Sequence, residues 1–199
     1  DSSTSRGLGD VYKRQGYETI DKYNHLLDFY LQYAKDFNEK HHFDIMAGYS
    51  WQHFHRSTEN AYNNLNGDNP TSYIFKTESY LISFFGRVNY DWKERYLFTF
   101  SLRHEGSSRF GENHKWGNFP AVSVGWRISD EKFMKGLSWI DDLKIRYDYG
   151  VTGNQEIGNY QSLATYKAYG WYQYGGNNFH VWGPSKNVNS ELRWEKGHN

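Results

Sequence analysis

The sequence predicts an all-β fold in which antiparallel up-and-down strands form part of a transmembrane β-barrel. Three observations predict it. The 199 residues include 18 Tyr, 13 Phe and 8 Trp but only 3 Pro, and aromatic residues favour pleated, half-buried strands. Apolar and polar residues alternate over segments longer than the strands of soluble proteins. Short and long connections also alternate along the chain, as they do in outer-membrane barrels.

Composition and charge exclude several classes of protein. The 23 basic and 23 acidic side chains balance, whereas a nucleic-acid-binding protein usually has a basic excess. Cysteine is absent, which excludes disulfides, thiolate metal sites and a cysteine nucleophile. The mean hydropathy of −0.93, without a long apolar run, excludes a transmembrane helix. It does not exclude transmembrane strands, since only every second residue of such a strand meets lipid.

The first fifteen residues, Asp1–Gln15, are interpreted as an artefact. They have no apolar period, and Asp10–Gln15 can be back-translated into the transposon end used to build sequencing libraries. We therefore exclude them from the fold, as for any cloning scar; a flexible natural linker is the alternative. Residues 16–199 are expected to form part of one barrel domain, and the gene is expected to be truncated at its 5′ end.

The clearest strand lies between Tyr80 and Trp92. Its even positions are apolar apart from Gly86, and its odd positions include Arg87 and Asn89, the alternation typical of a two-faced strand. The length exceeds the average of about 5–6 residues for soluble strands and suits a tilted membrane strand. The same pattern predicts six sequentially neighbouring strands, near residues 24–37, 41–53, 79–92, 96–106, 119–129 and 143–153, and the start of a seventh at Leu192 and Trp194.

The alternation assigns side chains to two faces. The apolar set is expected to face lipid, with aromatic residues such as Tyr90, Trp92 and Tyr96 near strand ends, where membrane barrels carry aromatic girdles. The set expected to face the barrel lumen is polar: Arg87, Asn89, Arg103, Arg127 and Arg146. The alternative is a soluble β-sandwich, in which the apolar set would form the core.

The connections predict which strand ends share a rim. Asn38–Lys40 and Lys93–Arg95 are expected to be tight turns, whereas 54–78, 106–118 and 153–190 are long and rich in Asn and Gly. Residues 129–142 belong to the short-turn rim and are expected to form a helical turn capped by Ser129 or Asp130. Six strands cannot close such a barrel, so a fragment is expected.

Several strings then resemble a known family. FGRVNYDWKERYLFTFSLRHEGSSRFGENHKWGNFPAVSVGWRISDEKFM (Phe85–Met134), LKIRYDYGVTGNQEIGNY (Leu143–Tyr160) and SELRWEK (Ser190–Lys196) are similar to SusC/RagA-type TonB-linked outer-membrane transporters. The resemblance implies a multi-pass outer-membrane barrel of about 22 strands around an N-terminal plug. It implies import of an oligosaccharide or peptide, driven by a TonB–ExbB–ExbD complex through the plug, with a SusD-type lipoprotein as lid.

One long connection carries a candidate binding surface. Trp171, Tyr172, Tyr174 and Trp182 lie among Asn and Gly residues. Flat rings stack on sugars, so these side chains are candidates for contact with a glycan. Tyr and Trp are also enriched at protein interfaces, so packing against neighbouring loops or the lid lipoprotein is the alternative.

The remaining motifs predict no catalysis and no cofactor. The string Gly106–Gly111 lacks the Gly-Lys-Ser/Thr ending of a phosphate-binding loop. His41 and His42 point to opposite strand faces, and His53 and His55 lack a clear third metal ligand. No nucleophile–base pair stands out, so an enzyme is not expected. The competing functions are a porin-like outer-membrane barrel and a soluble carbohydrate-binding module.

Overall fold

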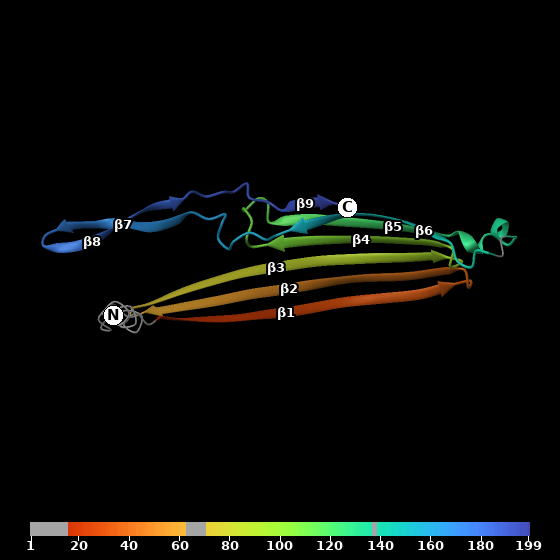
Figure 1. Ribbon diagram of the computed structural model, residues 1–199, viewed down its shortest axis with the longest axis horizontal. Coiled ribbons are helices and arrows are strands. Elements are labelled where there is room, and N and C mark those ends of the chain that lie inside the picture. The colour runs from red at the N-terminus through yellow and green to blue at the C-terminus, as the bar shows by residue number, and fades with distance from the viewer. Residues whose placement is uncertain (1–15, 63–70, 137–138) are drawn as a thin grey trace, which may run out of the picture. The chain divides into compact units, whose positions relative to one another are not determined.

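A computed structural model describes residues 16–62, 71–136 and 139–199 of the chain (Figure 1). The expected artefact at residues 1–15 lies outside the described residues. The chain divides into two units, one formed by Asp1–His25 with Gln52–Ser79 and the other by Leu26–Trp51 with Tyr80–Asn199. No described helix is long and apolar enough to cross a membrane, a finding that has no bearing on spanning by strands.

The strands form one antiparallel sheet and one separate hairpin. The sheet order is β1-β2-β3-β4-β5-β6-β9, so β1 to β6 are sequential neighbours as predicted. The sheet strands are β1 Gly16–Phe37, β2 His41–Tyr62, β3 Thr71–Trp92, β4 Tyr96–Ser107, β5 Trp116–Arg127, β6 Lys144–Asn154 and β9 Glu195–His198. The hairpin pairs β7 Thr165–Tyr174 with β8 Asn177–Lys186. Two stacked sheets, which the sandwich alternative requires, are not found among the described strands.

Three strands are longer than the sequence predicted. β1 begins at Gly16 rather than Asn24, β2 continues to Tyr62, and β3 begins at Thr71. The prediction of a long connection over 54–78 was therefore wrong for most of its length. Polar residues such as Glu59 and Thr77 weakened the apolar signal there, but pairing between neighbouring strands satisfies the backbone whatever the side chains are.

The strand register sorts the side chains into an apolar and a polar face. Directly opposed residues share a face, and Phe98 opposes Tyr90 on β3 and Val124 on β5, while Val124 opposes Tyr147 on β6. The apolar face thus includes Phe84, Val88, Phe98, Phe100, Val124, Trp126, Ile145 and Tyr147. The polar face includes Arg87, Asn89, Thr99, Arg103, Ser123, Arg127 and Arg146.

Side chains of the apolar face remain exposed in this chain. Tyr147 is 67% exposed, Ile145 56% and Phe84 50%. Such a surface is unusual for a soluble monomer and is the normal outer surface of a membrane barrel.

Two tight turns form where the sequence predicted them. Asn38 and Glu39 join β1 to β2, Lys93 and Glu94 join β3 to β4, and all four have positive φ. The Lys93 N–H donates to the Lys40 carbonyl at 2.6 Å, and the Arg127 N–H donates to the Arg95 carbonyl at 2.8 Å. The two turns and the start of the β5–β6 connection therefore lie side by side, and we call this edge the short-turn rim.

The β5–β6 connection differs from its prediction. It contains two short 3-10 turns, Ile128–Asp130 and Lys132–Met134, and neither has a side-chain cap. The expected cap at Ser129 or Asp130 was wrong: Arg127 precedes the first turn, and the Ser129 hydroxyl donates to Asp142 at 3.1 Å. Backbone bonds from Ile128 and Ser129 to the Leu143 carbonyl close the base of the connection instead.

The sequence did not predict a small aromatic cluster near the opposite ends of β4 to β6. Phe110 is 1% exposed, and its ring lies 4.8 Å from that of Trp194, which lies 5.1 Å from that of Phe119. The Trp194 indole donates to the Lys115 carbonyl at 2.9 Å. This cluster joins the β4–β5 connection to the segment that leads into β9.

Candidate functional site

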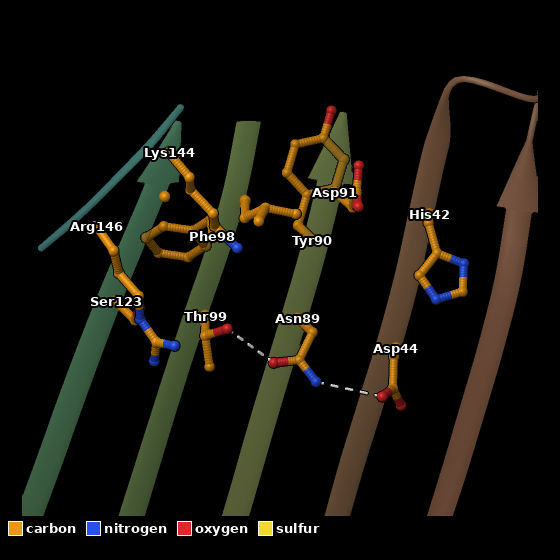
Figure 2. Close-up of a pocket in the computed structure, with 12 residues that line it drawn as sticks. His42, Asp44, Asn89, Tyr90, Asp91, Phe98, Thr99, Ser123, Lys144 and Arg146 are labelled. Atoms are coloured by element: carbon orange, nitrogen blue, oxygen red, sulfur yellow. Dashed lines mark hydrogen bonds between the residues drawn. The ribbon is translucent and has the colours of Figure 1, made fainter. Parts of the chain in front are cut away.

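A row of hydrogen-bonded side chains crosses the polar face near the short-turn rim. The Gln32 amide donates to Asp44 Oδ1 at 2.8 Å, and the Asn89 amide donates to Asp44 Oδ2 at 3.2 Å. Asn89 Oδ1 accepts from the Thr99 hydroxyl at 2.9 Å, and Figure 2 shows these last two bonds. Because the row fixes both ends of Asn89, it holds four neighbouring strands in one register.

The row lies in an open groove of about 320 Å³ whose two sides differ in charge. His42 and Asp44 line one side from β2, with Asp91 on β3, while Lys144 and Arg146 line the other from β6 (Figure 2). Neutral groups such as Ser123 lie between them. Such a groove can bind a polar partner that carries both charge signs, and it holds no nucleophile–base pair.

The basic side of the groove is partly neutralised within the chain. Arg146 Nε donates to Asp148 at 2.9 Å and to the Ser123 hydroxyl at 3.2 Å. Arg146 remains exposed, so it can form further contacts with a partner.

The five predicted lumen-facing residues share the polar face but do not gather into one site. Only Asn89 and Arg146 line the groove of Figure 2. Arg103 lies farther along β4, where it pairs with Glu105 at 2.8 Å. Arg127 contacts Asp130 at 3.7 Å and lines a second groove at the short-turn rim. The row itself consists of Gln32, Asp44, Asn89 and Thr99. The sequence did not predict their contacts, because these depend on the strand register.

The four aromatic candidates lie on the β7–β8 hairpin, where the sequence pattern predicted a long loop. Gly175 and Gly176, with φ of +58° and +79°, form its turn, and a Gly-Gly pair between two aromatic runs is a recognised hairpin signal. Trp171 opposes His180, with ring centroids 3.4 Å apart, and His180 also contacts Trp182. Tyr172 opposes Phe179 instead.

The hairpin therefore divides the candidates between two faces. Alternation along a strand places Trp171 with His180 and Trp182 on one face, and Tyr172 with Tyr174 on the other. Trp171 and Trp182 are 64% and 65% exposed. Each face is a separate candidate surface for stacking on a ligand or a protein.

The histidines form no metal centre in the described part of the chain. His41 contacts Tyr90 on the apolar face and His42 contacts Asp36, so the two point to opposite faces as predicted. His53 and His55 lie 3.6 and 3.1 Å from Glu78, with side chains 16% and 10% exposed. Both imidazole side chains are therefore largely covered.

Comparison with known proteins decides the family. The family model described as TonB dependent receptor-like, beta-barrel matches residues 1–199. The chain belongs to this family. It is 38% identical over 94% of its length to TonB-dependent receptor SusC of Bacteroides thetaiotaomicron, and 39% identical over 84% to TonB-dependent receptor P39 of Formosa agariphila. The resemblance to SusC/RagA-type proteins is confirmed, and these relatives are receptors rather than enzymes.

Solved structures agree with the family. The RagAB peptide transporter superposes on 93% of this chain with a TM-score of 0.82 and 25% identity, and the RagAB peptide importer in its open-open state on 92% with a TM-score of 0.78. This chain covers 22% and 21% of those chains, and 17% and 20% of the P39 and SusC receptors. It therefore corresponds to about a fifth of a TonB-dependent receptor, within the barrel domain.

Proposed function

We propose that the complete protein imports a nutrient, an oligosaccharide or a peptide, across the outer membrane. Its relatives include a SusC receptor and, among solved structures, a peptide transporter. The single observation that carries the proposal is the match to SusC over 94% of the chain. Import draws on a TonB–ExbB–ExbD complex through a plug, and a SusD-type lipoprotein covers the outer opening. The family match favours this reading over a passive porin-like barrel.

The two sheet faces support this role. The exposed apolar face suits contact with lipid, and the polar face suits a lumen that holds a plug and passes a polar nutrient. In this arrangement Arg87, Asn89, Arg103, Arg127 and Arg146 line the lumen. The groove of Figure 2, with acidic groups on β2 and β3 and basic groups on β6, suits a plug surface with charges of both signs.

The aromatic hairpin suits the extracellular mouth. It lies between β6 and β9, on the rim of long connections, and in outer-membrane barrels such connections face outward. Its two aromatic faces suit two contacts, one with the nutrient and one with the lipoprotein. We assign the face with Trp171 and Trp182, the indole face, to the nutrient, because indole rings offer a larger flat surface for stacking than phenol rings do. Each ring stacked on a ligand contributes on the order of 1 kcal/mol.

Face-specific variants of the complete protein test the assignment. The Trp171→Ala/Trp182→Ala variant is expected to weaken binding of oligosaccharides or peptides, measured by calorimetry, about tenfold or more. The Tyr172→Ala/Tyr174→Ala variant is the matched control for the opposite face and is expected to weaken co-purification with the lipoprotein instead. Unchanged ligand binding in the first variant would remove the indole face from the ligand site.

Transport itself is tested in cells. Deletion of the gene should abolish uptake of the labelled oligosaccharide or peptide that the wild-type cell imports. Loss of TonB should have the same effect, because a TonB-linked importer needs that energy source. Uptake that continues without TonB would indicate a passive porin.

A further inference from the structure

The indole face of the β7–β8 hairpin also carries two amide side chains. Gln173 opposes Asn178 in the strand register, two residues closer to the turn than the opposed pair of Trp171 and His180. Residues two apart on a strand point to the same side of it. Both amides therefore share the face of Trp171, His180 and Trp182, and we call Gln173 and Asn178 the amide pair.

The amide pair is available to a ligand. Gln173 and Asn178 are both exposed, and neither amide has a side-chain hydrogen bond among the described residues. Each amide group offers two donors on its nitrogen and an acceptor on its oxygen. Directly opposed residues have Cβ atoms about 5 Å apart, so both amides can contact one small ring.

The hairpin around this face carries no formal charge. The residues from Ala168 to Trp182 include no Asp, Glu, Lys or Arg, although these four types make up 23% of the chain. A peptide with charged termini or side chains would lose hydration on this face without gaining an ion partner. A sugar hydroxyl is uncharged and both donates and accepts hydrogen bonds. The absence of charge therefore favours a neutral, hydroxyl-rich ligand.

The spacing of rings and amides suits a sugar chain that runs along the hairpin. The amide pair lies about 7 Å along the strands from the pair of Trp171 and His180. A sugar ring stacked on Trp171 thus has its edge toward the amides, which can reach adjacent hydroxyls at that edge. Trp182 lies on the other side of Trp171 along the same face and can stack on the next sugar ring.

We propose that the amide pair determines the specificity of the indole face by hydrogen bonding to adjacent hydroxyls of a neutral oligosaccharide whose ring stacks on Trp171. The proposal rests on the proposed function, which assigns this face to the nutrient. It adds the residues that select the ligand, and it excludes acidic sugars and charged peptides from this face.

The test measures binding to the complete protein in detergent by calorimetry. The probes are neutral hexasaccharides of glucose, mannose and xylose, a hexasaccharide of galacturonic acid, and a hexapeptide with charges of both signs. A neutral hexasaccharide should bind most tightly to the wild-type protein. Gln173→Ala and Asn178→Ala should each weaken that binding about three- to tenfold. Asn177→Ala is the matched control and should leave it unchanged, because Asn177 opposes Tyr174 on the other face.

Deoxy analogues of the tightest-binding neutral hexasaccharide distinguish recognition from a structural effect. Removal of a hydroxyl that the amide pair contacts should weaken binding to the wild-type protein about three- to tenfold. The same analogue should bind the Gln173→Ala/Asn178→Ala variant as tightly as the parent sugar does, because the contact is already lost. A variant that only distorted the hairpin would retain the wild-type loss for the deoxy analogue.

Three results would overturn the proposal. They are tighter wild-type binding of the galacturonic acid hexasaccharide or the peptide, no wild-type binding of any neutral hexasaccharide, and a full deoxy loss in the double variant. Uptake by cells separates these results from failure of the proposed function. If gene deletion abolishes peptide uptake but leaves uptake of the neutral hexasaccharides unchanged, the importer stands and the specificity role of the amide pair does not.

Discussion

Glu131 is the residue that fixes the β5–β6 connection, and its ionisation should control that attachment. The hydroxyl of Tyr96 lowers the pKa of Glu131 by donating to the carboxylate, with further lowering from Trp126 and Arg95, against an opposing effect of burial. Because the pKa of Glu131 is lower in the folded state, these contacts stabilise the folded connection fully at any pH above the ordinary pKa of a glutamate side chain. Their contribution is lost as pH falls through the lowered pKa.

The predicted result is release of the connection in acid. A spin label at Gly136→Cys should be immobile at neutral pH and become mobile only at a pH below the ordinary pKa of a glutamate side chain. The Tyr96→Phe variant removes the main donor, so its release should occur at a higher pH. A spin label at Glu94→Cys is the control, and its mobility should not change over the same pH range. The same midpoint with and without the Tyr96 hydroxyl would contradict the assigned cause.

Among the glycines that the structure describes, Gly111 is the one where an added Cβ meets its closest contact. A Cβ there would overlap the backbone carbonyl group of Ser190, and the Gly111 N–H donates to the Leu192 carbonyl at 2.8 Å. Backbone cannot move aside as a flexible side chain can, so Gly111→Ala is expected to reduce the free energy of unfolding by about 1–3 kcal/mol.

Gly136→Ala is the matched control for Gly111→Ala, because a Cβ at Gly136 meets nothing within 4 Å. Denaturant unfolding of both variants in the complete, detergent-solubilised protein measures the difference. Equal unfolding midpoints for the two variants would show that Gly111 is not packed against the backbone at Ser190.

At the scale of elements, the two tight turns carry backbone conformations that their residues do not favour. Lys93 and Glu94 both have φ of +56°, where a side chain costs about 1 kcal/mol or more. Glu94→Gly should raise the free energy of unfolding by on the order of 0.5–1 kcal/mol, since the bond from the residue 94 backbone N–H to Asp91, 2.6 Å long, is kept.

The control for the turn is Lys40→Gly. Lys40 closes the β1–β2 turn without a positive φ, so glycine there only adds freedom to the unfolded chain. A loss of about 0.5–1 kcal/mol is expected. Thermal melting of the two variants gives shifts of opposite sign, and destabilisation by Glu94→Gly would contradict this account of the turn.

The elements also show which sequence signals were sufficient. Period-2 alternation located β4, β5 and β6 to within a few residues, because one face of each is consistently apolar. It failed for the outer halves of β2 and β3, where apolar and polar residues do not alternate regularly and hydrogen bonding to neighbours maintains the strand. The β7–β8 hairpin was not predicted although Gly175-Gly176 marks its turn, because aromatic residues occupy both faces of its strands and give no apolar–polar alternation.

For the whole molecule, sequence pattern predicted the sheet and family but not the contacts between distant segments. The alternation of apolar and polar residues assigns the side chains of β3 to β6 to the two faces of the sheet. The division into a polar and an apolar face was therefore predictable from the sequence. The cluster of Phe110, Phe119 and Trp194 was not, because it joins segments far apart in the chain and places aromatic rings where the pattern predicts polar ones. The groove of Figure 2 was missed for the same reason: its two sides come from β2 and β6.

The exposed apolar face leads to a prediction about residues 16–199 taken alone. Every residue of β1 is exposed, and the apolar faces of β3 to β6 add further large side chains. Soluble monomers rarely expose more than a few hundred Å² of contiguous apolar surface, and an open edge strand pairs readily with other chains. The isolated polypeptide should therefore aggregate or remain unfolded in water, whereas the complete protein should fold in detergent.

Size-exclusion chromatography and circular dichroism of both proteins test this prediction. The polypeptide of residues 16–199 should elute as aggregate without a cooperative melting transition, and detergent should dissolve it without restoring one, because the sheet still lacks the strands that close a barrel. The complete protein in the same detergent is the control and should melt cooperatively at high temperature. A monomeric, sharply melting form of residues 16–199 in water would mean that the apolar face finds a partner within the chain, and the assignment of that face to lipid would then fail.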